Sequence, residues 1–272
     1  MIPRNLYDSD HEIFRQSVRK FIETQAVPHH DKWEKDGMVS DDIWLGAGAQ
    51  GFLCPTVSEK YGGVEADFKY NCIVNEEIAR SGCTGLGWTL HSDIAVPYIE
   101  RYGTEFQKQK YLPKCVSGEL ITAIAMSEPG AGSDLQGAKT TAVLHGDHYI
   151  LNGSKTFITN GQKSGLVIVV AKTDVNAGSK GISLFLVESE FEGFSKGKNL
   201  EKLGMKAQDT SELFFQDVKV PKENLLGEEG RGFIYLMQDL PQERLSIAVG
   251  AIANAQALLE STISYTKERK AF

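Results

Sequence analysis

The sequence predicts a multidomain protein of mixed α and β structure, in which an N-terminal helical domain, a middle β-barrel domain and the start of a C-terminal helical bundle follow one another. The prediction rests on two changes in the hydrophobic pattern. Apolar residues recur at helical spacing to about residue 120, follow strand-like patterns to about residue 220, and return to helical spacing after Gly232. We therefore expect domains at residues 1–120, 121–230 and 231–272.

The N-terminal domain is expected to be helical because its apolar side chains lie three or four residues apart. Such residues are Ile13, Val18, Phe21 and Ile22, followed by Tyr70, Ile73, Val74, Ile78 and Ala79. Breaks between helices are expected at Pro28, at the glycine pair 62–63, at Gly82 and at Pro113, because proline and glycine disfavour the interior of a helix.

Residues 46–51 (GAGAQG) match the GxGxxG spacing of dinucleotide-binding loops. The pattern before them is helical and the pattern after them is extended, whereas a dinucleotide-binding fold requires a strand first and a helix second. We interpret these glycines as a helix end with a glycine cap.

The middle domain is expected to consist of short β-strands. β-branched or alternating apolar residues occur at 149–151, 166–170, 182–187 and 213–215. Turn residues separate these segments at 146–147, 152–153, 160–161 and 176–178. We interpret Asn152-Gly153-Ser154, formally a glycosylation sequon, as a hairpin turn. Such strands close as a barrel or a sandwich.

The composition excludes several classes of function. The chain has 272 residues, of which 41% are hydrophobic and 24% charged, enough for two or three packed units. Its net charge of −7 and the lack of a basic stripe argue against nucleic acid or anionic membranes as partners. The sequence has no apolar run long enough to span a membrane and no signal-peptide core. We expect a cytoplasmic protein in a bacterium, or a mitochondrial matrix protein after processing.

The cysteines are expected to be buried free thiols in a reducing compartment. They are Cys54, Cys72, Cys83 and Cys115. They form no CxxC pair and have no histidine beside them at ligand distance, and the adjacent histidines 29–30 cannot easily face one metal together. We predict no metal site.

The most informative stretch is residues 125–134 (AMSEPGAGSD), followed by residues 155–161 (KTFITNG). The pattern predicts a strand, a glycine-opened turn and a second strand, which together can hold a flat ring or a pyrophosphate. Ser127 supplies a short hydroxyl on the first segment and Thr159 supplies one on the second. The glycines of the turn, Gly130 among them, remove Cβ atoms that would hinder close approach of a ligand.

Glu243 is the candidate catalytic residue. It is expected near the start of a helix whose other residues are apolar, shortly after Pro241, a residue suited to the first helical turn. One explanation is a favourable interaction with the helix dipole or with Arg244. The functional explanation is a general base in an apolar cleft, with a pKa raised by desolvation.

At these residues the chain resembles the acyl-CoA dehydrogenase family over its whole length. The matching motifs, in the order of the family, are 125–134 (AMSEPGAGSD), 151–155 (LNGSK), 157–161 (FITNG), 202–205 (KLGM), 217–221 (DVKVP) and 268–272 (ERKAF). Residues 206–210 (KAQDT) and 241–244 (PQER) are most similar to the long-chain branch. The resemblance implies an FAD-dependent enzyme of fatty-acid β-oxidation that introduces a trans double bond between C2 and C3 of an acyl-CoA thioester. Glu243 would be the base and flavin N5 the hydride acceptor.

The resemblance also implies roles for individual residues. The flavin would be bound by Ile124, Ala125, Met126, Ser127, Gly132, Ser133, Phe157, Ile158 and Thr159, and by Arg269 and Phe272 of a neighbouring subunit. The acyl-CoA would be bordered by Ser133, Ser179, Lys180, Pro241, Gln242, Glu243 and Arg244. Neutral donors near the flavin would favour its reduced anionic form.

The resemblance implies partners as well. These are an electron-transferring flavoprotein and further copies of the chain in a homotetramer or homodimer. Family members continue beyond residue 272 to complete the helical bundle, and a lone apolar helix cannot bury itself, so we expect this sequence to be part of a longer chain. Three alternatives stay open: an acyl-CoA oxidase, a flavin monooxygenase of the same fold, or an inactive fragment that acts only in binding or assembly.

Overall fold

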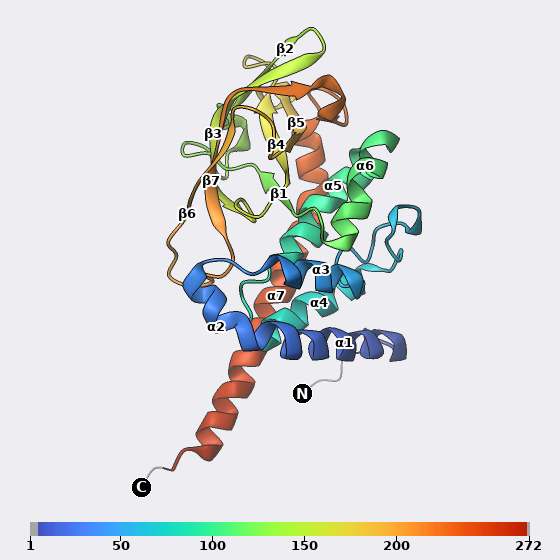
Figure 1. Ribbon diagram of the computed structural model, residues 1–272, viewed down its shortest axis with the longest axis vertical. Helices are drawn as coiled ribbons and strands as arrows, with labels where there is room; N and C mark the ends of the chain where they lie inside the picture. The colour runs from blue at the N-terminus through green and yellow to red at the C-terminus, as the bar shows by residue number, and fades with distance from the viewer. Residues whose placement is uncertain (1–4, 271–272) are drawn as a thin grey trace.

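The structure is a computed structural model that describes residues 5–270, and it confirms the mixed α and β fold class. Figure 1 shows the N-terminal helices at one end and the β-strands at the other, with the long helix α7 (Gly232–Glu268) running beside both. The candidate site lies between the β-stranded part and α7.

The N-terminal part is built from helices joined by short turns. In order they are α1 (Ser9–Phe21), η1 (Ile22–Ala26), α2 (Val27–Asp36), α3 (Asp41–Ala49), η2 (Glu59–Tyr61), α4 (Phe68–Ser81), η3 (Leu90–Ala95), α5 (Val96–Tyr102) and α6 (Glu105–Ser117). Capping residues fix several ends. Asp8 accepts two backbone N–H bonds at the start of α1, and Gly82 ends α4 with a left-handed φ of 74°.

The glycine breaks are confirmed, but the two proline breaks are wrong. The chain stays helical from α1 to α2, because the π-helical turn η1 lies directly before Pro28 and the proline falls in the first turn of α2, where proline is best tolerated. Pro113 lies inside α6, where Tyr111, Leu112, Cys115 and Val116 are buried on both sides of it. This packing outweighs the one backbone hydrogen bond that the proline removes.

The GxGxxG segment lies at a helix end, as predicted. Helix α3 ends at Ala49, and Gly51 follows with a left-handed φ of 72°. Gly48 is inside the helix, where a Cβ atom would lie 2.1 Å from the backbone oxygen of Ser117. The glycine therefore allows α3 to approach the end of α6.

The middle part is one eight-stranded sheet. Its strands are β1 (Thr122–Ala125), β2 (Thr141–His145), β3 (His148–Thr159), β4 (Leu166–Lys172), β5 (Ile182–Glu188), β6 (Phe194–Asn199), β7 (Thr210–Pro221) and β8 (Leu225–Leu226). Short turns η4 (Leu135–Gly137), η5 (Gly178–Gly181) and η6 (Lys222–Asn224) lie between strands. The order is β6-β7-β3-β2-β4-β5-β8, with β1 parallel to the first half of β4.

The sheet curls around a core of its own. Strand β2 pairs with β4 only at Thr141 and Lys172, near the end of β4. Strand β1 pairs with the preceding part of β4 instead. The inward side chains include Ala123, Ala125, Tyr149, Leu151, Val167, Val169, Phe185, Val187, Leu213, Val218 and Val220. Small residues on β1 let it approach β3 and β4 closely.

The hairpin turn predicted at residues 152–154 is wrong. These residues lie inside β3, at a bulge in its pairing with β7. Gly153 has a φ of 151°, and a Cβ atom there would lie 2.4 Å from Oγ1 of Thr140. The hairpin between β2 and β3 is instead made by Gly146, another predicted turn residue, with a φ of 64°.

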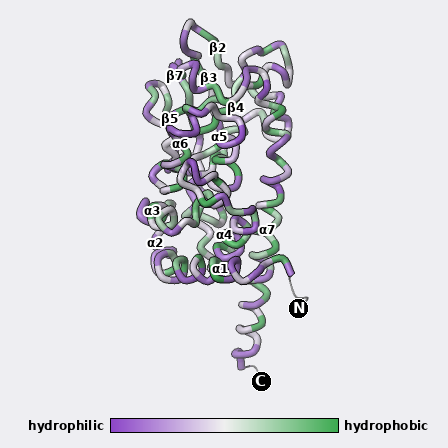
Figure 2. Tube along the Cα trace, turned by 90° about the vertical axis from the view of Figure 1, so that its right-hand side faces the viewer, coloured by the Kyte–Doolittle hydropathy of each residue, from purple (hydrophilic) through white to green (hydrophobic). Residues whose placement is uncertain are grey.

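Helix α7 is buried over its first half only. Tyr235, Leu236 and Ser246 are buried there, whereas Leu258 is 69% exposed in the part that extends beyond the other helices. Figure 2 shows that hydrophobic residues continue along that part. Pro241, expected in the first helical turn, lies well inside α7, so Glu243 is a mid-helix residue.

Two further observations concern the described residues. No helix among them is both long and apolar enough to cross a membrane. The four cysteines are free, and three of them are buried, while Cys72 is partly buried.

Candidate active site

The turn after β1 forms one wall of the candidate site. Glu128 and Ala131 exchange two backbone hydrogen bonds of 2.8 and 3.1 Å, which close a tight turn around Pro129 and Gly130. An added Cβ atom at Gly130 or Gly132 would meet nothing within 4 Å. The packing of the chain therefore does not require glycine there, and the turn leaves open space on its outer side.

A buried ion pair that the sequence did not predict holds this turn. Nζ of Lys155, on β3, lies 2.8 Å from Oε1 of Glu128 and donates to the backbone oxygen of Met126 at 3.2 Å. The Glu128 carboxylate also accepts the backbone N–H groups of Lys139 and Thr140. Burial alone would raise the pKa of Glu128, but the charge of Lys155 and these hydrogen bonds bring it below its usual value.

A buried histidine, His91 of η3, holds strand β1 in place. Thr122 donates its backbone N–H to Nδ1 of His91 at 3.1 Å, and Nε2 of His91 lies 3.0 Å from the backbone oxygen of Cys115. Burial lowers the pKa of His91 to about 4, so the ring is neutral near pH 7. Ile124 and Ala125 on this strand are buried and pair with β4, so neither presents an exposed side chain to a ligand.

The end of β3 adjoins this turn, although none of its residues lines the candidate pocket. Phe157 is 71% exposed and has a left-handed φ of 59°, which is uncommon for a bulky residue. Its neighbour Ile158 is buried, and Thr159 is half-buried and pairs with Thr210 of β7. The backbone N–H of Thr156 donates to the oxygen of Ser127 at 3.0 Å and joins the two segments.

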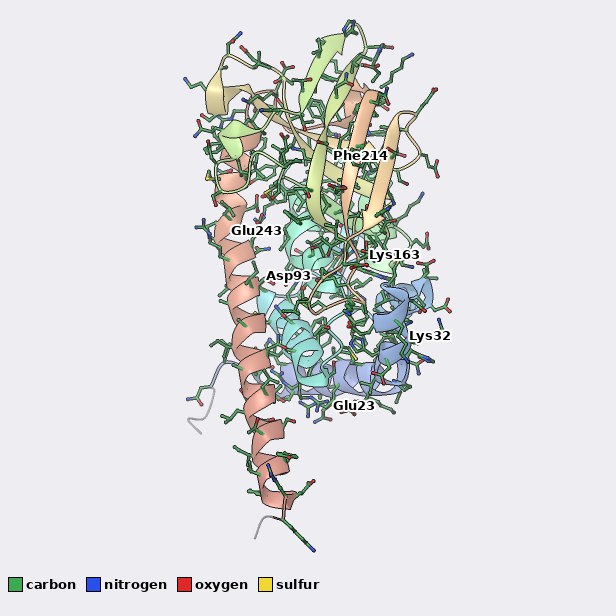
Figure 3. All side chains as sticks on the ribbon, turned by 90° about the vertical axis from the view of Figure 1, so that its left-hand side faces the viewer. Glu23, Lys32, Asp93, Lys163, Phe214 and Glu243 are labelled. Carbon is green, nitrogen blue, oxygen red and sulfur yellow. The ribbon has the colours of Figure 1, made fainter. Side chains whose placement is uncertain are left out.

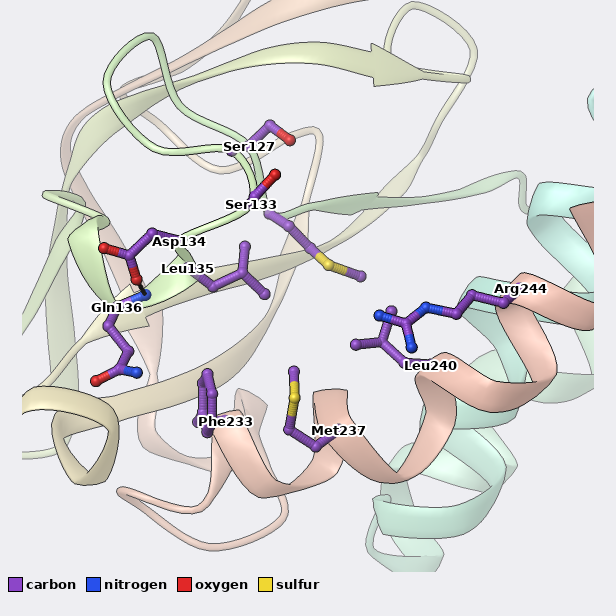
Figure 4. A pocket seen from close by; sticks show the side chains of 11 residues that line it. Ser127, Ser133, Asp134, Leu135, Gln136, Phe233, Met237, Leu240 and Arg244 are labelled. Carbon is purple, nitrogen blue, oxygen red and sulfur yellow. Dashed lines mark hydrogen bonds between the residues drawn. The ribbon is translucent and has the colours of Figure 1, made fainter.

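A cavity of about 410 Å³ separates this turn from helix α7. Five predicted site residues line it, namely Met126, Ser127, Gly132, Ser133 and Arg244. The sequence analysis did not assign the others to the site: Asp134, Leu135, Gln136, Phe233, Met237 and Leu240. Figure 4 shows Phe233, Met237, Leu240 and Arg244 pointing from α7 towards the turn. These residues are spaced by four, three and four positions, so they share one face of the helix. This spacing is the sequence signal that could have identified them as site residues.

Glu243 lies on the neighbouring face of α7, turned towards α5. It is 7% exposed, and Tyr98 of α5 donates its hydroxyl to Oε1 at 2.7 Å. Burial raises the pKa of Glu243, while the Tyr98 hydrogen bond and the charge of Arg244 act in the opposite direction. Its side chain is not among those that line the cavity, although Leu240 and Arg244, on either side of it, are.

A polar network continues along this face of α7, and Figure 3 labels its member Asp93 beside Glu243. Asp93 of η3 is buried and accepts hydrogen bonds from Asn71 at 2.7 Å and from Ser246 at 2.6 Å. Burial raises the pKa of Asp93 to about 6, against the effect of these two bonds. Gln242, a predicted substrate residue, instead donates to the backbone oxygen of Asp93 and accepts from Arg101.

The other predicted residues lie at the margin of the cavity or away from it. Ser179 is half-buried and Lys180 is exposed, on the η5 turn next to Gln136. Pro241 is exposed. Arg269 is exposed at the end of α7, about 38 Å along the helix from Arg244 at 1.5 Å per residue. Phe272 lies outside the described residues. Among the residues that the structure describes, no cluster of His, Cys, Asp or Glu could hold a metal ion.

Comparison with known proteins gives consistent matches. The family models described as the N-terminal, middle and C-terminal domains of acyl-CoA dehydrogenase match residues 8–119, 123–218 and 230–272. The chain is 55% identical to the mouse long-chain specific acyl-CoA dehydrogenase, mitochondrial, over 99% of its own length and 63% of that protein. It therefore spans less than two thirds of this curated relative.

Solved structures give the same result. A crystal structure of acyl-CoA dehydrogenase from Geobacillus kaustophilus is 54% identical, with a TM-score of 0.97 over 99% of this chain and 72% of that one. An acyl-CoA dehydrogenase complexed with FAD from Bacillus anthracis is 34% identical, with a TM-score of 0.91 over 100% of this chain and 47% of that one.

Proposed function

The chain belongs to the acyl-CoA dehydrogenase family, and from this premise we propose that its site performs the FAD-dependent α,β-dehydrogenation of an acyl-CoA thioester to a trans-2-enoyl-CoA. One observation carries the proposal. A buried carboxylate, Glu243, stands on the helix that forms one wall of the cavity, and the turn at residues 127–134 forms the other. The reaction needs a base on one side of the substrate and an electron acceptor on the other.

The residues of the turn fit a flavin. The open space beside Gly130 and Gly132 and the hydroxyls of Ser127 and Ser133 in the cavity support its binding there. The proposed FAD residues are Ile124, Ala125, Met126, Ser127, Gly132, Ser133, Phe157, Ile158 and Thr159. When bound, FAD accepts the hydride that leaves C3.

The remaining chemistry falls to side chains of α7. Glu243 removes the proton from C2, and its raised pKa brings it closer to the working pH of a base. Phe233, Met237 and Leu240 make this wall apolar and exclude water from the substrate. Arg244 brings a positive charge into the cavity, which favours an anionic substrate such as an acyl-CoA.

We further propose the partners and the assembly. Electrons leave the reduced flavin to an electron-transferring flavoprotein, and the chain works as a homotetramer or homodimer in a bacterial cytoplasm or a mitochondrial matrix. Arg269, exposed at the end of α7, would reach the FAD of a neighbouring subunit. Light scattering of the full-length natural protein tests the assembly, and a monomer with full activity would contradict it.

The decisive experiment uses the full-length natural protein loaded with FAD. Acyl-CoA added without oxygen should bleach the flavin absorbance, and Glu243→Gln should slow bleaching by about 10²–10⁴-fold, the usual effect of losing a general base. Glu260→Gln is the matched control, since Glu260 is exposed on the same helix. Unchanged bleaching in Glu243→Gln would disprove the base assignment.

Two other outcomes would redirect the proposal. Oxygen consumption with acyl-CoA as fast as turnover with an artificial acceptor would indicate an oxidase or a monooxygenase. Colourless protein that takes up no FAD would indicate a binding or assembly role.

A further inference from the structure

We propose that Tyr98 is a positioning residue for Glu243, which fixes the carboxylate against α5 through Oε1 and leaves Oε2 to receive the substrate proton. The inference rests on the proposed function of Glu243 as the base. Oε1 accepts the Tyr98 hydroxyl at 2.7 Å, and no other described residue donates a hydrogen bond to the carboxylate. One oxygen is therefore held and the other is free to take a proton.

The environment of Tyr98 leaves its hydroxyl no other role. Tyr98 is fully buried, and its hydroxyl has Glu243, 145 residues further along the chain, as its hydrogen-bond partner. Burial, followed by the nearby charge of Glu243, raises the pKa of Tyr98 far above its usual value. The hydroxyl stays protonated at any working pH, and it can only donate to the carboxylate.

Separate contacts hold the two helices together around this pair. Arg101 of α5 pairs with Asp239 and Gln242 of α7. Tyr102 stacks on Tyr235 with ring centroids 4.1 Å apart. Removing the Tyr98 hydroxyl alone should therefore leave α5 and α7 in register.

Few other charges face Glu243. Arg244 follows it on α7, and Asp239, one turn earlier, is neutralised by Arg101 of α5. Asp93 of η3 reaches this face only through its hydrogen bonds with Ser246 and Gln242. The titration of Glu243 should thus respond chiefly to Tyr98 and Arg244.

Tyr98→Phe in the full-length, FAD-loaded protein tests the inference. The carboxylate loses its donor, so the acidic limb of the kcat/KM profile for flavin reduction by acyl-CoA should move up by about one pH unit. The rate at the pH of the original limb should fall severalfold, with little change in KM.

Tyr102→Phe is the matched control. It removes a hydroxyl from the same helix face, one that donates to Gln238 at 3.2 Å and does not touch Glu243. Its pH profile should equal that of the unaltered protein. Incorporation of 3-fluorotyrosine at position 98 keeps the ring and strengthens the donor, so it should move the limb to lower pH even if Tyr98→Phe folds poorly.

The outcomes separate the two hypotheses. If acyl-CoA does not bleach the unaltered protein, or if Glu243→Gln bleaches normally, the proposed function fails and the role of Tyr98 fails with it. If Glu243→Gln is inactive while the Tyr98 variants keep the acidic limb of Tyr102→Phe, only the role of Tyr98 is refuted. The role of Tyr98 is supported if the acidic limb of the kcat/KM profile moves to higher pH in Tyr98→Phe and to lower pH with 3-fluorotyrosine at position 98.

Discussion

Replacement of Lys155 by methionine would test how the turn at residues 127–134 is held. The change removes the buried cation beside Glu128 and keeps a side chain of similar length. Glu128 then stays in the interior with two donors, the backbone N–H groups of Lys139 and Thr140.

The expected loss of stability follows from these contacts. Breaking a buried ion pair by removing one partner costs about 3–5 kcal/mol. The two remaining backbone donors put Glu128 near the lower end of that range, and the lost hydrogen bond from Lys155 to Met126 adds about 1 kcal/mol. We therefore expect Lys155→Met to lower the free energy of unfolding by about 4 kcal/mol.

Urea unfolding at pH 7 measures this change. Lys32→Met is the control, because Lys32 is exposed and pairs with Asp36 on the surface of α2, a pair worth less than about 1 kcal/mol. The double variant Glu128→Gln/Lys155→Met removes both charges and should be more stable than Lys155→Met alone. A loss below about 1 kcal/mol in Lys155→Met, or a double variant less stable than the single one, would refute this account of the pair.

Two further predictions concern the helical part. His91 has a pKa of about 4 in the fold and about 6.5 when unfolded, so only the unfolded chain binds the extra proton between these values. The free energy of unfolding should therefore fall by about 2 kcal/mol from pH 7 to pH 5. In urea titrations His91→Gln should show a smaller loss over this range, and an unchanged pH dependence would contradict the prediction. Gly48→Ala should lower the free energy of unfolding by about 1–3 kcal/mol, because the added Cβ would clash with the backbone of Ser117. Gly46→Ala should lower it less, because its Cβ would meet only the end of the Phe21 ring, 2.9 Å away. Thermal unfolding of the two variants compares them, and equal losses would count against the close approach of α3 and α6.

The sequence predicted the parts of the fold that depend on local pattern. Helical spacing identified the helices around Val18 and Ile73, and β-branched runs identified β4 and β5. Local signals failed where tertiary packing decides between two uses of a residue. Pro113 stays in a helix because its neighbours are buried, and Gly153 forms a bulge because β3 continues past it against β7.

The candidate site was predictable where short motifs supply it. The turn near Ser127 was identified from its glycines and hydroxyls, and Arg244 from a four-residue motif. The partners of these residues come from distant segments. Lys155 and Tyr98 act on residues 27 and 145 positions away, and no local pattern distinguishes them from an ordinary lysine or a core tyrosine.

Helix α7 also limits how the chain can change in length. Phe233, Met237, Leu240 and Arg244 face the cavity while Glu243 faces α5, and both directions are set by one continuous helix. Each residue turns a helix by about 100° and advances it by about 1.5 Å. One residue inserted between Phe233 and Glu243 would rotate the carboxylate away from Tyr98. The segment from Phe233 to Glu243 can therefore tolerate substitutions but not insertions or deletions. The surface loops between the strands are not restricted in this way, because their length does not set the direction of side chains on a helix.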